Sequence, residues 1–436
     1  MIRHPRDGAA AAPVAFDAAG AAILLVHLAA AIASRSVAWP EITTPAYLWS
    51  RGWILYRDVK FLHTPGLIGL LALAFRIGGP QTWIVRAFAI AGPLAGHGFV
   101  LRYTRGIPLL RRVLVSAFFL VSVFVADGNA VWPVAAMAAL SVPITVALTK
   151  ESWWRAGLLI GAAILMKQTA AYVLAVVVLV LLARRSFRAL VPLVMGASAP
   201  YAAALAAFAA LGAASEMLRW TILVPFQVQE VTFAPSLFTL GVLGLALLPT
   251  AVAAALEKSP RVPSAAWLLA VGLGFLLLCY PNFLMLQTVA ALPCLAVGAG
   301  RLLELVSVRL APAVAAFLLV FTLSRGIVAA ADATFDGTVL FWNDDPDLNA
   351  VVERLRRSPP ETRVHSELWA NVLPRSARLP PGHIWVHPWL RWYFEVENVR
   401  VRVLTAARAA GTIWVGYRSA LPGGERIGAY AVEVVR

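Results

Sequence analysis

Long apolar stretches recur along the first three quarters of the chain and then stop. From Ala18 to about Ala330, apolar runs near the length of a bilayer-crossing helix alternate with short segments that contain Arg, Pro and Trp. After Ala331 charged residues are frequent, and apolar runs are too short to cross a bilayer. The pattern predicts a polytopic α-helical membrane domain over residues 1–330 and a small α/β domain over residues 331–436.

The apolar runs predict about eleven spans. They cover residues 18–38, 82–101, 113–126, 131–148, 156–166, 169–183, 189–211, 236–256, 265–280, 284–300 and 310–330. Two of them, 113–126 and 156–166, are short for a full span, which allows tilted or re-entrant packing. The apolar stretch Gly66–Phe75 predicts an interfacial helix in the first loop. The first run lacks a small-residue cleavage site, which favours a retained helix over a signal peptide.

The region after residue 330 has the pattern of a small α/β domain. A helix is predicted at Asp347–Arg357, with an Asp-rich turn before it, and three apolar segments read as short strands. These segments are Thr362–Ser366, Thr412–Tyr417 and Ala429–Val435. An aromatic cluster lies between them and would either stack on sugars or seat the domain on the membrane face; it comprises Trp385, His387, Trp389, Trp392 and Tyr393.

Composition supports a membrane protein. Apolar residues make up 60% of the chain and charged residues 14%, whereas a soluble globular chain has about half and about a quarter. The formal charge of +15 is then explained by basic loops that fix orientation, so nucleic-acid binding is not expected. The only cysteines, Cys279 and Cys294, both lie in apolar stretches, which argues against a disulfide framework or a zinc site.

The basic residues also predict the orientation. With the N-terminus in the cytoplasm, 15 Lys and Arg residues before residue 330 fall on the cytoplasmic side and 9 on the other. This bias places the protein in the cytoplasmic membrane with its C-terminal domain outside the cytoplasm. Six of the nine outer residues lie between Arg35 and Arg86. They would bind either an anionic ligand such as a phosphate or the headgroups of the outer leaflet.

Few carboxylates lie at the predicted outer edge of the membrane. Glu41 follows the first span, Asp58 and His63 lie in the first loop, and Asp127 lies in the turn between the third and fourth spans. Ionisable groups at membrane depth are candidates for function. For each carboxylate the alternative is a solvated residue or a helix cap, and for Asp127 an ordinary Asp-Gly-Asn turn.

Lys167 interrupts the apolar stretch Gly161–Val180. It would either extend to the lipid phosphates or point into a cavity that holds a phosphate. The neighbouring Gln168 and Thr169 favour the cavity, because they add polar partners. The chain has no Walker motif and no Gly-rich nucleotide loop after a strand. A catalytic site would therefore face outward, with a donor that arrives through the lipid.

Several short motifs resemble the GT-C superfamily of membrane glycosyltransferases, closest to bacterial relatives of protein O-mannosyltransferases and lipid A aminoarabinose transferase. The first loop, Gly52–Asp58 followed by His63–Gly66, resembles the family's first outer loop. Lys167–Thr169 resembles a family "KQT" segment. The remaining similarity lies in Tyr280-Pro281-Asn282 and Ala291-Leu292-Pro293, with Gln287 where histidine is common, and in the tail from Arg375 to Pro381.

The resemblance implies an inverting hexosyl or pentosyl transferase. Its donor would be a polyprenyl-phosphate-linked sugar, and its acceptor a glycan, lipid or protein on the outer face of the membrane. Glu41 would be the catalytic base, with Asp58 second in line, and Asp127 would support the site or bind a divalent metal ion with Glu41. Lys167, Arg57 and Gln168 would bind the donor phosphate, and His63 would orient a substrate. Many family members have Asp where this chain has Glu41, which changes the reach of the carboxylate.

Two alternatives do not require a catalytic base. One is a transporter or flippase of lipid-linked sugars without transferase activity, which would be favoured by inverted repeats with broken helices. No convincing repeat is present, although prolines interrupt many of the predicted helices. The other is a non-catalytic assembly subunit in which Glu41 and Asp127 have structural roles.

Overall fold

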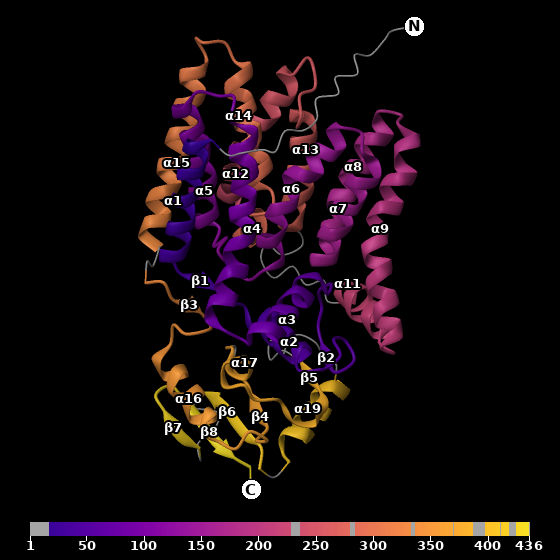
Figure 1. Ribbon diagram of the computed structural model, residues 1–436, viewed down its shortest axis with the longest axis vertical. Helices are drawn as coiled ribbons and strands as arrows, with labels where there is room; N and C mark the ends of the chain where they lie inside the picture. Colours follow the sequence, from indigo (N-terminus) through magenta and orange to yellow (C-terminus); the bar gives the residue numbers. More distant parts are fainter. Residues whose placement is uncertain are drawn as a thin grey trace.

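The computed structural model describes residues 17–227, 236–279, 284–332, 336–368, 370–386, 397–409, 411–417 and 424–435. Most of the described chain is helical. The apolar helices run roughly side by side, and the C-terminal residues gather at one end of the bundle (Figure 1). This arrangement buries apolar faces between helices, as expected of a membrane bundle.

Each predicted span contains a helix. The corresponding helices are α1 (Ala18–Ala33), α4 (Thr82–Tyr103), α5 (Leu109–Val125), α6 (Pro133–Thr149), α7 (Trp153–Met166), α8 (Ala171–Ala183), α9 (Phe187–Ala210), α12 (Leu237–Leu256), α13 (Ala265–Leu276), α14 (Leu292–Leu305) and α15 (Ala311–Asp332). Within the described residues, 3 helices are long and apolar enough to cross a membrane: α4, α9 and the part of α12 from Thr239 to Leu256. The number of spans remains a prediction.

One predicted segment is built differently. Residues 284–300 are predicted as a single helix, but a 3-10 turn, η4 (Met285–Thr288), precedes α14, which begins only at Leu292. Pro293 explains the late start, because proline fits the first turn of a helix and would break its interior.

The first loop holds two helices, of which only one is predicted. The predicted helix at Gly66–Phe75 is α3 (Gly66–Gly78). The second, α2 (Pro40–Ser50), contains Pro40 in its first turn and Pro45 in its interior. The sequence pattern does not predict this helix, because an interior proline removes one backbone hydrogen bond and normally argues against a helix. Most of α2 is nevertheless buried, so packing compensates for the missing bond.

Beyond residue 336 the chain forms a small mixed sheet with short helices against it. The sheet has the order β4-β6-β8-β7, with β4 (Val364–Ser366), β6 (Ile413–Tyr417), β7 (Glu425–Ile427) and β8 (Tyr430–Val434). Strand β4 pairs with β6 in parallel, and β8 pairs with β6 and β7 antiparallel. The helices are α16 (Pro346–Arg356), α17 (Val372–Ser376) and α19 (Glu397–Ala407). The predicted helix and three predicted strands are all present, and Asp345 caps α16 through the backbone N–H groups of Asp347 and Leu348.

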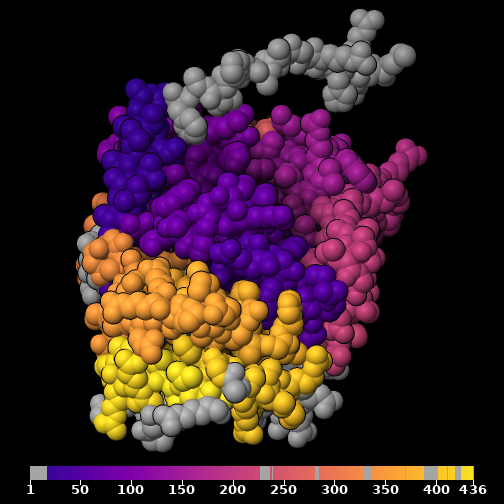
Figure 2. Space-filling view, turned by 60° about the horizontal axis from the view of Figure 1, so that its bottom comes forward, coloured from indigo at the N-terminus to yellow at the C-terminus, as the bar shows by residue number. Residues whose placement is uncertain are grey.

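Two short parallel ladders attach the C-terminal residues to the N-terminal loop. Strand β1 (Ser36–Val37) pairs with β3 (Val339–Leu340), and β2 (Val59–Lys60) pairs with β5 (Trp385–Val386). Figure 2 shows the orange and yellow C-terminal surface directly against the violet first loop. Because the two regions share these ladders, the division at residue 330 remains a prediction.

Three of the six outer basic residues between Arg35 and Arg86 contact other parts of the protein. Arg35 forms an ion pair of 3.0 Å with Asp336, and Arg86 donates to the carbonyl oxygen of Gly337. The Lys60 ammonium lies 3.6 Å from the Glu216 carboxylate. These outer charges therefore hold segments of the chain together.

Two predicted features lie wholly or partly outside the described residues. In the aromatic cluster, His387, Trp389, Trp392 and Tyr393 lie outside the described residues. Trp385 is described and lies buried in β5. Of the segment from Tyr280, it describes the chain from Leu284 onward.

Candidate active site

Lys167 is a buried cation at the junction of two apolar helices. Its ammonium donates a hydrogen bond of 3.0 Å to Oε1 of Gln287, and only 5% of the residue is exposed. The ammonium also lies 5.9 Å from the centre of the Trp132 ring, within range of a cation–π contact. The residue lies between the two predicted spans, and burial lowers its pKa to about 8.

The local backbone explains why Lys167 points inward. Helix α7 ends at Met166, and Lys167 is extended before the 3-10 turn η1 (Gln168–Ala170) leads into α8. The end of α7 is fixed by the first loop, because the Thr64 hydroxyl donates 2.7 Å to the carbonyl oxygen of Ile164. A Cβ on Gly66 would lie only 2.6 Å from the carbonyl oxygen of Leu165. Only glycine permits this close approach of α3 to α7.

Several buried polar atoms around Lys167 have no hydrogen-bond partner among the described residues. These atoms are Nδ1 of His63, Oε1 of Gln168, Oγ1 of Thr169 and Nε1 of Trp132. Buried polar atoms normally form hydrogen bonds. Several such atoms without a partner, close together, therefore indicate a site for a polar ligand or for water. Burial, and after it the charge of nearby Lys167, lower the pKa of His63 to about 3 against an opposing contact with Gln168, so the imidazole is neutral at physiological pH.

Aromatic rings connect Lys167 to the segment that carries Glu41. The Trp132 ring lies 5.6 Å from the His63 ring and 5.7 Å from the Trp39 ring. Trp39 is the residue before α2, and Glu41 lies in the first turn of that helix, where it is partly exposed. The aromatic contacts thus connect the start of α2, which carries Glu41, to the ring that lies beside Lys167.

The turn that contains Asp127 pairs with the chain just before α2. The Val37 N–H donates a hydrogen bond of 2.9 Å to the Asn129 carbonyl oxygen, and the Val131 N–H donates one of 2.8 Å to the Val37 carbonyl oxygen. The Asn129 side chain also donates 2.9 Å to the Ser34 hydroxyl. The Asp127 side chain is exposed on this turn. The segments of Glu41 and Asp127 are therefore neighbours, although they are more than eighty residues apart.

Asp58 and Arg57 bind each other and close a turn. The Asp58 carboxylate accepts a hydrogen bond of 2.8 Å from the Ile54 N–H and one of 3.0 Å from Arg57 Nε. Burial raises the pKa of Asp58, but the hydrogen bonds from Arg57 and Ile54 outweigh burial and leave this pKa below its usual value. The Asp58 carbonyl accepts from Trp385, so the turn also contacts the C-terminal residues.

A metal site with several protein ligands is not found among the described residues. Within the described part of the chain, no three His, Cys, Asp or Glu residues lie close enough together to hold an ion. A Mg²⁺ ion often uses only one or two carboxylates together with substrate phosphates, and a site built on Glu41 and Asp127 stays a prediction.

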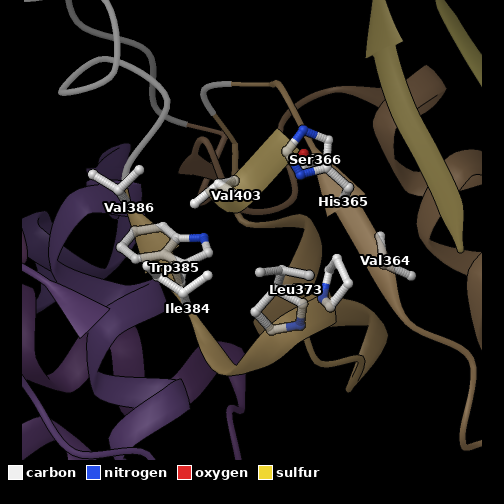
Figure 3. Close-up of a pocket in the computed structure, with 10 residues that line it drawn as sticks. Val364, His365, Ser366, Leu373, Ile384, Trp385, Val386 and Val403 are labelled. Carbon is white, nitrogen blue, oxygen red and sulfur yellow. The ribbon is translucent and has the colours of Figure 1, made fainter. Parts of the chain in front are cut away.

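A separate pocket lies in the C-terminal region (Figure 3). Val364, His365 and Ser366 from β4 form one side, and Ile384, Trp385 and Val386 form another. The His365 Nε2 lies 3.5 Å from the Glu367 carboxylate. None of the residues predicted to bind the donor phosphate lines this pocket.

Reading the sequence missed two residues of the Lys167 cluster as contributors. Trp132 stands directly before the first proline of α6, where a tryptophan reads as an ordinary interfacial anchor. Gln287 is noted only as a replacement for histidine, and its contact with Lys167 joins residues 120 positions apart. Only the folded chain reveals that contact.

Two comparisons with known proteins find no relative, and a third finds the fold. No protein-family profile and no curated protein matches the sequence. Among solved structures, ArnT from Cupriavidus metallidurans bound to undecaprenyl phosphate matches with a TM-score of 0.65 and 14% sequence identity, over 95% of this chain and 96% of that chain. The apo form of the same protein matches with a TM-score of 0.61, 14% identity and the same coverage.

The chain has the fold of these ArnT structures. This finding confirms the fold that the short motifs of the first loop and of Lys167–Thr169 imply. The similarity extends over 95% of this chain. At 14% identity the comparison shows the fold alone.

Proposed function

We propose that the protein is an inverting membrane glycosyltransferase that uses a polyprenyl-phosphate-linked sugar. The shared fold supports this proposal, because the similar ArnT structure holds undecaprenyl phosphate. ArnT is a lipid A aminoarabinose transferase of the same fold class. The acceptor would be a glycan, lipid or protein at the outer face of the cytoplasmic membrane, with the N-terminus of the chain in the cytoplasm.

The observation that carries the proposal is the cluster around Lys167. A buried lysine is costly unless an anion compensates its charge, and among the described residues Lys167 donates its hydrogen bond to the neutral amide of Gln287. The unpartnered polar atoms of His63, Gln168 and Thr169 lie in the same region. A phosphate would accept hydrogen bonds from Lys167 and Thr169 and neutralise the charge. Arg57 would assist from the first loop by exchanging its contact with Asp58.

In this mechanism the acceptor hydroxyl attacks the anomeric carbon while the bond from that carbon to the phosphate oxygen breaks. Glu41 takes the hydroxyl proton, and the polyprenyl phosphate leaves with its charge stabilised by Lys167. Attack opposite the leaving group inverts the anomeric centre. His63 is neutral and would orient a substrate rather than donate charge.

Glu41 is a better base than Asp58 on physical grounds. The hydrogen bonds to Asp58 hold its pKa down, and a carboxylate with a low pKa is a weak proton acceptor. Asp58 also binds the Ile54 N–H and Arg57, so protonating it would disrupt the turn. Asp58 therefore has a structural role in this proposal.

A divalent ion between Glu41 and Asp127 is part of the proposal. Such an ion would neutralise charge on the donor phosphate while two carboxylates hold it. Treatment of the purified protein with EDTA should lower transfer, and Mg²⁺ or Mn²⁺ should restore it. If transfer is unchanged after chelation, the ion has no part in the mechanism and Asp127 is a supporting residue.

The catalytic assignment is tested by transfer with purified protein in lipid nanodiscs. The donor is the pool of polyprenyl-phosphate sugars extracted from the native membrane, and release of polyprenyl phosphate is measured. Glu41→Gln should lower the rate by about 10²- to 10⁴-fold, because it removes the general base. Asp58→Asn should reduce the rate less than about tenfold, because it weakens one turn. Equal rates for Glu41→Gln and the wild type would contradict the assignment.

Phosphate binding is tested separately with undecaprenyl phosphate itself. Lys167→Ala should weaken its affinity about 10- to 100-fold, because a hydrogen bond to a charged group contributes about 1.5–3 kcal/mol. Lys150→Ala is the matched control, since Lys150 is exposed at the end of α6. Transport of the lipid across proteoliposomes without sugar transfer would instead support a flippase.

A further inference from the structure

Asn371 links the C-terminal region to the helix that carries Glu41. The residue is 0% exposed and stands directly before α17. Its side-chain amide donates 2.8 Å to the carbonyl oxygen of Ala38, a residue 333 positions earlier in the chain. The same amide donates 2.8 Å to the carbonyl oxygen of Phe341, and its oxygen accepts from the Thr43 hydroxyl.

These contacts lie on both sides of Glu41. Ala38 is three residues before it, and Thr43 is two residues after it. The N-terminus of α2 has no side-chain cap from its own flanking residue, Trp39. Helix ends without a cap are usually satisfied by other groups or fray, so Asn371 supplies from a distance part of the order that a local cap would give.

Neighbouring contacts repeat the same connection. The Ala38 N–H donates 3.1 Å to the Leu340 carbonyl, which continues the β1–β3 ladder. The Trp39 ring lies 5.3 Å from Phe341 on one side and 5.7 Å from Trp132 on the other. The C-terminal region therefore determines how the start of α2 lies against the ring that contacts Lys167.

We propose that Asn371 is a positioning residue for sugar transfer, which acts by fixing the backbone on both sides of Glu41. This inference rests on the proposed function. A shift of about 1 Å in a catalytic group can lower a rate about 100-fold. The side-chain hydrogen bonds of Asn371 within the described residues go to Ala38, Phe341 and Thr43 and to no residue of the Lys167 cluster, so the donor phosphate should bind as before.

The first test separates the rate from donor binding. Asn371→Ala should lower kcat for transfer about 10- to 100-fold and change the KM for the donor less than about threefold. Asn349→Ala is the matched control, because this asparagine contacts Asn343 and Arg375 within the C-terminal region only. A loss of undecaprenyl phosphate affinity together with a lower unfolding temperature would overturn the inference and leave Asn371 a purely structural residue.

The second test asks whether Asn371 acts through Glu41. The double variant Asn371→Ala with Glu41→Gln should be no slower than Glu41→Gln alone, because residues that act as one unit are not additive. Additive losses would show that Asn371 acts on the rate by another route and would overturn the inference.

A third measurement does not depend on transferase activity. Hydrogen exchange of the backbone from Ala38 to Pro45 should become faster in Asn371→Ala, while exchange across Lys167–Ala170 stays unchanged. Unchanged exchange at Ala38–Pro45 would overturn the inference even if the protein transfers no sugar. If exchange changes as expected but the wild type transfers no sugar, the proposed function fails and the structural link remains.

Discussion

At the scale of single residues, the most unusual feature is a buried lysine, Lys167, that is surrounded by buried polar atoms. Lys167 is buried, its amide partner Gln287 is neutral, and polar atoms of His63, Gln168 and Thr169 beside it have no partner within the part of the chain that the structure describes. Burying a cation this way costs free energy that a solvated lysine would not cost. In the proposed function, a donor phosphate would recover that free energy on binding.

The lowered pKa of Lys167 gives a prediction for pH dependence. Lysine is charged below its pKa and neutral above it, so kcat/KM for the donor should fall as the pH rises through about 8. Lys167→Arg should remove this decline, because arginine stays charged over the whole range. Rates should be measured between about pH 6 and pH 10. A decline that persists in Lys167→Arg would assign it to another group.

At the scale of elements, the contact between α3 and α7 sets the position of Lys167. The start of α3 approaches the last turn of α7 so closely that Gly66 has no room for a side chain. The hydrogen bond from Thr64 to Ile164 holds the same turn from the first loop. The first loop is therefore part of the wall of the site and more than a connection between spans.

Gly66→Ala should disturb this contact. The added carbon would collide with backbone rather than with a flexible side chain, so we expect a loss of about 1–3 kcal/mol of stability and a reduced affinity for undecaprenyl phosphate. Gly241→Ala in α12 is the control, since nothing lies within 4 Å of its added carbon. Thermal unfolding in detergent and lipid binding would be measured together. Equal behaviour of the two variants would show that α3 does not constrain α7.

At the scale of the whole molecule, the C-terminal region is built into the first loop. The ladders β1–β3 and β2–β5 and the buried Asn371 all join residues far apart in sequence. In the ion pair between Arg35 and Asp336 each side chain is 36% exposed, so the pair contributes little to stability at physiological salt. Buried backbone pairing holds the two regions together.

This arrangement predicts that the two regions stay associated after the chain is cut. A protease site inserted between Asp332 and Asp336 should yield two fragments that co-purify in mild detergent, also at about 0.5 M salt, where surface ion pairs are screened. Adding Asn371→Ala should weaken the association. Separation of the fragments at low salt would show that the ladders do not hold them, and size-exclusion chromatography distinguishes the outcomes.

The sequence determined those features that depend on short stretches of chain. Apolar runs predicted where the long helices lie, because burying an apolar segment needs only length and composition. Alternation and turn residues predicted α16, β4, β6 and β8 after residue 336. Lys167 was identified in the same way, since a charge inside an apolar stretch stands out without knowledge of its neighbours.

The tertiary structure alone decided which residues meet. The helix α2 was hidden by Pro40 and Pro45, and packing rather than propensity stabilises it. The partners of Lys167 and the link from Asn371 to Ala38 join positions 120 and 333 residues apart. No local pattern encodes such pairs, because side chains far apart in sequence become neighbours only when the helices pack and the C-terminal strands add to the first loop.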